Sequence, residues 1–164
     1  MLKDWGVAIG LAAAVYVLIG WLQPSRDLPE NAPPIAVTTL DGEQWSLAQQ
    51  AGKPVVLNFW ATWCGPCKKE IPDFSRFAED HPGVPVIGIS MDEPKMSSGQ
   101  LRAKAKALGV RYPVARITDA IRSDYDVRSL PTTVVVGADG TVRTVRVGAM
   151  SYQSLVRAVG KTAG

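Results

Sequence analysis

The only two cysteines of this 164-residue chain, Cys64 and Cys67, lie three positions apart. The apolar, β-branched run 54–60 precedes them and predicts a strand that is buried on both faces. The run 68–80 follows them and has apolar residues at helical spacing, so the pair is expected at a turn from strand to helix. Such spacing in a first helical turn brings both side chains to one face, at the ~5.5 Å Cα separation of a disulfide. The pair is therefore a redox dithiol or half of a metal site.

Composition argues against the metal site and against a nucleic-acid partner. Two cysteines are too few for a structural zinc site, which needs four ligands. His81 is the only histidine, and it lies in a stretch that resembles a helix end followed by a turn, where a surface role is expected. No metal or other cofactor is expected. The net charge of +3 is small, and the basic stretch 102–116 alternates with apolar residues, which is typical of a solvated helix face.

The position of the two cysteines predicts different roles for them. Cys64 is expected at the helix N-terminus, where unpaired N–H groups and the helix dipole should lower its pKa below ~8.5. Cys67 is expected one turn later and more deeply buried, so Cys64 would attack a substrate disulfide and Cys67 would resolve the mixed disulfide. Pro66 suits the first helical turn because it needs no N–H partner. Asn58, a polar residue in the buried strand, either forms a structural hydrogen bond or tunes the site, and Trp63 either packs beside the site or is a core aromatic.

The N-terminal segment 1–24 is predicted to be a transmembrane anchor. No residue between Trp5 and Ser25 is charged, and about 20 such residues span a ~30 Å hydrocarbon core. Trp5 and Trp21 lie near the two ends, where indoles favour the membrane interface. A cleaved signal peptide is the alternative, but 20–24 is a poor cleavage site. The very short N-terminal tail and a weak positive-charge bias predict that the rest of the chain lies outside the cytoplasm.

After the anchor, a polar, proline-rich linker is expected over 25–34 and one domain over 35–164. Asp-Gly at 41–42 between two apolar runs predicts a β-hairpin. Strands and helices then alternate to about residue 125, which predicts a parallel sheet covered on both faces, and a last hairpin within 132–147 adds an antiparallel edge before a C-terminal helix. The alternating elements are expected at 54–60, 68–80, 84–91, 97–108, 112–115 and 118–125.

The run from Phe59 to Lys68, which reads Phe-Trp-Ala-Thr-Trp-Cys-Gly-Pro-Cys-Lys, resembles the thioredoxin active-site signature. Leu-Pro-Thr at 130–132, Asp-Gly at 139–140 and Val-Gly-Ala at 147–149 resemble the second half of the same fold. The leading hairpin, the strand–helix segment at 84–108 and Lys-Lys-Glu-Ile-Pro at 68–72 are similar to the TlpA/ResA-like branch of extracytoplasmic thioredoxins. The resemblance covers about residue 35 to the end. It implies a thioredoxin-like α/β fold, with a mixed sheet sandwiched by helices, an N-terminal β-hairpin and a central strand–helix insert, preceded by one transmembrane helix.

The resemblance also implies roles for individual residues. Pro131 would be a cis-proline that faces the cysteines, Leu130 would pair its backbone with an extended substrate, and Trp63 would contact substrate. Asn58 occupies the position where thioredoxin has a buried aspartate that assists proton transfer, and an amide cannot titrate. Glu70 matches an acidic residue of the ResA-like branch and is the expected substitute, although it equally fits a surface helix residue that pairs with a neighbour.

The implied function is a membrane-anchored thiol–disulfide oxidoreductase of the inner membrane, with its domain on the periplasmic side, that reduces protein disulfides. Apocytochrome c or copper-site proteins would be substrates, and a membrane thiol-transporting reductase would donate electrons. Three alternatives remain. A CcmG/DsbE-type cytochrome c maturation thioredoxin usually has Gly-x-Pro-Glu, where 129–132 reads Ser-Leu-Pro-Thr. A peroxiredoxin needs Thr-x-x-Cys, where 62–64 reads Thr-Trp-Cys. A copper-site assembly factor usually adds a distant histidine to spaced cysteines, and the only histidine here is His81.

Overall fold

The computed structural model describes residues 28–160 of the chain. The predicted anchor at 1–24 lies outside this range, and no helix within the range is long and apolar enough to cross a membrane. The strands are β1 Ala36–Thr38, β2 Gln44–Ser46, β3 Val55–Trp60, β4 Val86–Ser90, β5 Val114–Arg116, β6 Thr132–Val136 and β7 Val142–Val147. The helices are the 3₁₀ turn η1 Ala48–Gln50 and the α-helices α2 Gly65–Asp80, α3 Ser98–Ala107, α4 Asp119–Asp124 and α5 Tyr152–Gly160.

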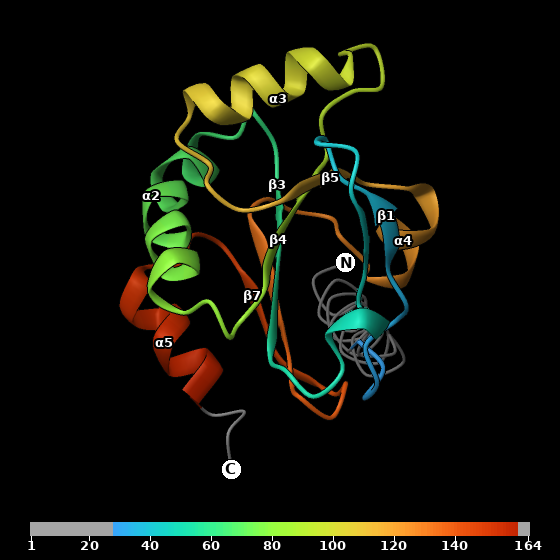
Figure 1. The fold of residues 1–164 in the computed structure, drawn as a ribbon, viewed down its shortest axis with the longest axis vertical. Coiled ribbons are helices and arrows are strands. Elements are labelled where there is room, and N and C mark those ends of the chain that lie inside the picture. The colour runs from blue at the N-terminus through green and yellow to red at the C-terminus, as the bar shows by residue number, and fades with distance from the viewer. Residues whose placement is uncertain (1–27, 161–164) are drawn as a thin grey trace, which may run out of the picture.

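The fold is a five-stranded mixed sheet in the order β5-β4-β3-β6-β7, beside a separate β1–β2 hairpin. β4 pairs parallel with β3 and with β5, which confirms the parallel part expected from strand–helix alternation. β6 pairs antiparallel with both β3 and β7, which confirms the antiparallel edge. Figure 1 shows α2 and α5 on one side of the sheet, α4 and β1 on the other, and α3 across one end.

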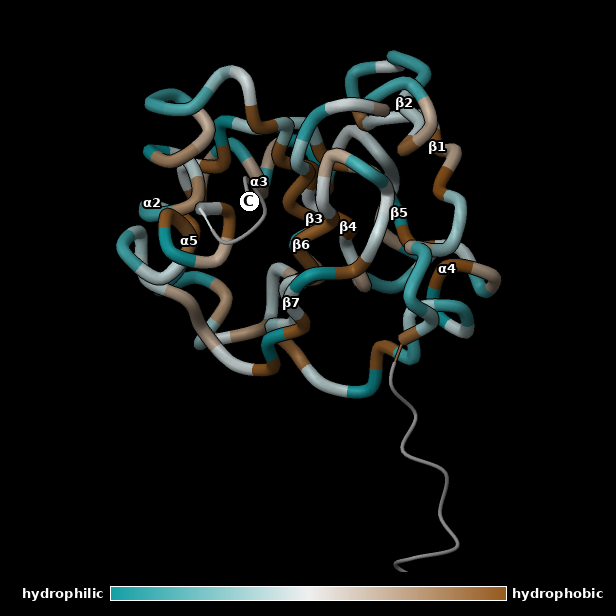
Figure 2. The backbone as a smooth tube through the Cα atoms, turned by 90° about the horizontal axis from the view of Figure 1, so that it is seen from below, coloured by the Kyte–Doolittle hydropathy of each residue, from teal (hydrophilic) through white to brown (hydrophobic). Residues whose placement is uncertain are grey.

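β3 is the central strand, and all six of its residues are buried. Side chains alternate between the faces of a sheet, so β3 contributes to two different cores. Leu57 and Phe59 pack with α4 and the segment after it, through Ile121 and Tyr125. The even-numbered positions face α2, α3 and α5, and they include the polar Asn58. Figure 2 shows hydrophobic residues gathered on these central strands.

Turn and capping residues lie at several element ends. Gly42 has φ +88° in the hairpin turn, a conformation that favours glycine. Ser97 caps α3 in a reciprocal capping box with Gln100, and Thr118 caps α4. Pro72 lies inside α2, and the helix continues through it.

The segment 28–34 lies against the domain. The Ala32 N–H donates to the Gly140 carbonyl at 2.9 Å, and the Val142 N–H donates to the Glu30 carbonyl at 2.8 Å. The Tyr125 hydroxyl donates to the carbonyl of residue 33 at 2.6 Å. The described part of the predicted linker is therefore attached beside the start of β7.

Candidate active site

The two cysteines lie where β3 ends and α2 begins, and they form a disulfide with a Cα–Cα separation of 5.3 Å. Cys64 is the N-cap of α2, and its Sγ accepts the Cys67 N–H at 3.2 Å. Pro66 lies in the first turn, as expected. An N–H that points at Sγ from a helix N-terminus stabilises a thiolate there once the disulfide is reduced. This geometry is the one that the expected nucleophilic role of Cys64 requires.

The surroundings of the pair are asymmetric. Cys67 is fully buried, Cys64 is 5% exposed, and the adjacent Trp63 is 65% exposed. The interpretation of Trp63 as a core aromatic is therefore wrong. Its indole lies beside the cysteines in the sequence and is open to solvent, which suits contact with a protein surface.

A buried carboxylate, Asp92, holds the loop that presents Cys64. It accepts hydrogen bonds from the Thr62 N–H at 2.9 Å, the Thr62 hydroxyl at 2.5 Å and the Ser90 hydroxyl at 2.8 Å. Thr62 lies two residues before Cys64, and its hydroxyl is hydrogen-bonded to Asp92. Asp92 was missed in the sequence, although a signal existed: β3 and β4 are parallel neighbours, so the residues that follow them meet at one edge of the sheet.

Glu70 is buried on α2, and the interpretation of it as a surface residue is wrong. It is 2% exposed, and both carboxylate oxygens accept hydrogen bonds. Asn58 Nδ2 donates to Oε1 at 2.8 Å, and the Met150 N–H donates to Oε2 at 2.9 Å. Glu70 follows Cys67 by three residues, a spacing at which helix side chains share a face.

Burial dominates the electrostatics of Glu70. Desolvation raises its pKa from 4.5 to about 7, against the opposing effects of the Met150 and Asn58 hydrogen bonds. A carboxyl group with such a pKa is present in both protonation states near neutral pH, as a proton acceptor and donor requires. The sequence pointed to Glu70 through the resemblance, but its direct bond to Asn58 was not predicted.

The loop before β6 contains the expected cis-proline, because the Leu130–Pro131 peptide bond is cis. Leu130 packs against the hydrophobic cluster that contains both cysteines, so this loop lies beside the redox pair. The Pro131 carbonyl accepts the Gly148 N–H at 2.8 Å. Within residues 28–160 the backbone N–H and carbonyl of Leu130 make no hydrogen bond, as the predicted pairing with a substrate segment requires.

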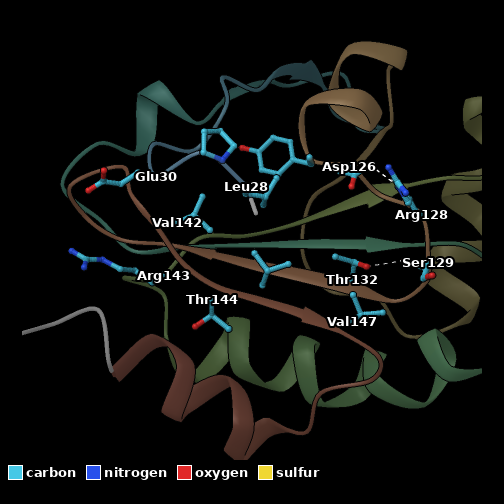
Figure 3. Close-up of a pocket in the computed structure, with 13 residues that line it drawn as sticks. Leu28, Glu30, Asp126, Arg128, Ser129, Thr132, Val142, Arg143, Thr144 and Val147 are labelled. Atoms are coloured by element: carbon cyan, nitrogen blue, oxygen red, sulfur yellow. Dashed lines mark hydrogen bonds and ion pairs between the residues drawn. The ribbon is translucent and has the colours of Figure 1, made fainter. Parts of the chain in front are cut away.

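A pocket of about 480 Å³ lies on the far side of the same loop, between the 28–30 segment, the α4 end and the strands β6 and β7. Figure 3 shows Leu28 and Glu30 on one side of it and Thr132 and Val147 on the other. Its lining contains neither cysteine, so the redox chemistry is not performed in this pocket.

The comparisons with known proteins agree with this geometry. A family model described as AhpC/TSA family matches residues 28–145. The chain belongs to this thioredoxin-like family. The thiol-disulfide oxidoreductase ResA of Bacillus subtilis (strain 168) is 34% identical over 145 residues, which cover 82% of this chain and 78% of ResA. The thioredoxin-like protein YneN of the same organism is 33% identical over 127 residues, 77% of this chain and 75% of YneN.

Solved structures give the same result. A thioredoxin family thiol:disulfide interchange protein from Chlorobium tepidum TLS has a TM-score of 0.74 at 30% identity, covering 85% of this chain and 100% of its own. A structure of MTB dsbF in mixed oxidized and reduced forms has a TM-score of 0.71 at 28% identity, covering 84% and 100%. This family member is therefore a thiol–disulfide oxidoreductase of ResA/DsbE type with a Cys64–Cys67 pair.

Proposed function

We propose that the chain reduces disulfides of extracytoplasmic proteins, with Cys64 as the attacking thiolate and Cys67 as the resolving thiol. One observation carries the assignment of the two roles: the Cys64 Sγ accepts an N–H at the start of α2, while Cys67 is fully buried. Cys64 is the more exposed of the two residues, at 5% against 0%, so a substrate sulfur can approach it more readily.

The reaction transfers two electrons from the dithiol to the substrate. The Cys64 thiolate attacks one substrate sulfur, which breaks the substrate disulfide and releases the other sulfur as a thiolate that takes up a proton. Cys67 then loses its proton and attacks the Cys64 Sγ. The Cys64–Cys67 disulfide forms, and the second substrate sulfur leaves and is protonated.

Cys67 needs a base in the second step, because a buried thiol does not exchange protons readily with water. Glu70 is the proposed acceptor, since it lies three residues further along α2 and its pKa is about 7. The substrate thiolate needs a proton in the same step, so a group near neutrality serves both transfers.

The location and the clients are further parts of the proposal. The uncharged segment between Trp5 and Ser25 supports a single-pass anchor in the inner membrane, with the domain on the periplasmic side. Apocytochrome c or copper-site proteins are the proposed substrates, and a membrane thiol-transporting reductase is the proposed electron donor. The relatives named thiol-disulfide oxidoreductase support an action on protein disulfides.

The division of labour is tested by trapping. The full chain in mild detergent, as Cys67→Ser, is reduced and mixed with insulin as a model disulfide protein. It should accumulate a mixed disulfide through Cys64 that is visible on non-reducing gels, while Cys64→Ser should form none. Equal trapping by both variants would refute the assignment of roles.

The direction of electron flow is tested in cells that express the chain, by acid quenching followed by thiol labelling. A reductant is held mainly as the dithiol, whereas a pair that stays mainly oxidised would make the protein an oxidant. The clients trapped by Cys67→Ser identify the substrate class, since capture of apocytochrome c or of copper-site proteins distinguishes the two proposed substrates.

A further inference from the structure

Tyr112 lies behind Asn58 on the side away from Glu70, and its hydroxyl donates to Asn58 Oδ1 at 3.2 Å. Asn58 Nδ2 in turn donates to Glu70 Oε1 at 2.8 Å. The three side chains are 6%, 0% and 2% exposed, in that order. The two hydrogen bonds therefore form a chain in which each group donates to the next: the hydroxyl donates to the amide oxygen, and the amide nitrogen donates to the carboxylate.

We propose that Tyr112 is a positioning residue that locks the Asn58 amide with its nitrogen toward Glu70. The catalytic importance of this lock rests on the proposed function, whereas the lock itself does not. A side-chain amide has a donor end and an acceptor end of nearly equal shape, so its orientation is set by its partners. Turning the amide would leave the buried Tyr112 O–H without its acceptor, which costs free energy.

The hydroxyl remains a donor throughout the working pH range. Burial, and then the charge of Glu70, raise the pKa of Tyr112 far above its ordinary value. A phenol held in its protonated form keeps the Asn58 oxygen occupied, whether Glu70 is ionised or not.

Gly88 leaves room for the Tyr112 ring on the face of the sheet where Asn58 lies. Gly88 on β4 is paired in register with Asn58 on β3, so a side chain at either position points to the same face. A Cβ at Gly88 would lie 3.0 Å from the Tyr112 ring and 2.8 Å from Trp60 Nε1. Only glycine leaves room for the ring, which also packs against Phe74 of α2 with the centroids 6.4 Å apart.

The fixed amide affects Glu70 because its oxygen, which could accept a hydrogen bond from protonated Glu70, faces Tyr112 instead. Both carboxylate oxygens face N–H donors, from Asn58 and from Met150, and this arrangement favours the ionised form. Without the Tyr112 hydroxyl, the amide is free to turn and offer its oxygen to a protonated Glu70. The protonated form then gains a partner, and the carboxyl group should titrate at higher pH.

Within residues 28–160, the groups that hydrogen-bond the Glu70 carboxylate are the Asn58 amide and the Met150 N–H, neither of which titrates. Cys67 lies one turn earlier on α2 and titrates only when the disulfide is reduced. The Asn58 amide lies between Tyr112 and Glu70, since it is hydrogen-bonded to both. The outer side of Tyr112 adjoins a pocket of about 310 Å³ whose charged residues are Asp41, Arg102 and Lys106. Asp41 and Arg102 are paired there at 3.1 Å. The oxidised protein therefore isolates the effect of the lock from cysteine titration.

The test is a carboxyl titration of the oxidised full chain, labelled with ¹³C at the glutamate carboxyls and followed by NMR. The chain has five glutamates, and Glu70→Gln identifies the resonance of Glu70. Tyr112→Phe keeps the ring and should raise the Glu70 midpoint by about one pH unit, roughly the effect of one hydrogen bond. Tyr125→Phe is the control, since it removes another buried hydroxyl, which donates to a backbone carbonyl away from Glu70.

An unchanged or lowered midpoint in Tyr112→Phe, or an equal rise in Tyr125→Phe, would overturn the proposal. The wild type supplies a test that needs no variant. The Asn58 side-chain NH₂ should show proximity to Glu70 on both sides of the midpoint, and an amide that turns over would contradict the lock. If the carboxyl titration shifts but the pH profile of insulin reduction does not, the lock stands and the proton-transfer role of Glu70 in the proposed function fails.

Discussion

Replacing Glu70 by glutamine should remove a pH dependence of stability that the wild type shows near neutrality. The folded pKa of Glu70 is about 7, and its ordinary value is 4.5. Between these values the folded protein holds a proton on Glu70 that the unfolded chain has released. The folded state binds more protons, so the free energy of unfolding must fall as the pH rises through this window.

The magnitude follows from the shift. A difference of about 2.5 pH units at ~1.4 kcal/mol each predicts a loss of about 3 kcal/mol between pH 4.5 and pH 8. The stabilisation is fully present below pH 4.5 and is lost as the pH passes 7. Glu70 is 2% exposed, so solvent screening reduces this figure little.

Urea unfolding of the oxidised full chain in mild detergent, at intervals from pH 4.5 to 8, measures the loss. The wild type should lose roughly 3 kcal/mol across this range, and Glu70→Gln should lose little of it. Glu79→Gln is the matched control, because Glu79 lies on the same helix but is exposed and paired with Arg111. Equal slopes in wild type and Glu70→Gln would refute the assignment of a raised pKa to this residue.

Three further substitutions test the surroundings of the site. Asp92→Asn places an amide N–H₂ against donors of Thr62, so the protein should lose ~1–3 kcal/mol in urea unfolding and the Thr62 N–H should exchange faster with deuterium. Gly88→Ala should cost ~1–3 kcal/mol in the same assay, because the new methyl meets Trp60. Trp63→Ala should change stability by less than ~0.5 kcal/mol but slow insulin reduction, because the indole is exposed beside Cys64.

The sequence was sufficient where the controlling interactions are local. A continuous apolar run located β3, and apolar residues at helical spacing located α2. The Cys64–Cys67 spacing placed the disulfide at the first turn of α2. The order of the strands in the sheet did not follow from such patterns, because strand pairing depends on contacts between segments that are far apart in the sequence.

The environment of the proton acceptor was beyond prediction for the same reason. Asn58 is 12 residues from Glu70, Met150 is 80 residues from Glu70, and Tyr112 is 54 residues from Asn58. Each belongs to a different segment, and no periodicity relates them. The resemblance named the acid, but only the folded chain reveals that a strand amide binds it and a tyrosine holds that amide.

Desolvation of the Glu70 carboxyl group accounts both for its stability cost and for its proposed catalytic use. Desolvation raises the carboxyl pKa to about 7, which suits exchange of a proton with Cys67. The same desolvation makes the ionised form costly in the folded protein at alkaline pH. The donors from Asn58 and Met150 limit that cost by favouring the charge, and Tyr112 maintains one of them. A variant that relieves the cost, such as Glu70→Gln, should therefore lose the pH-dependent instability and the rate of the resolving step together.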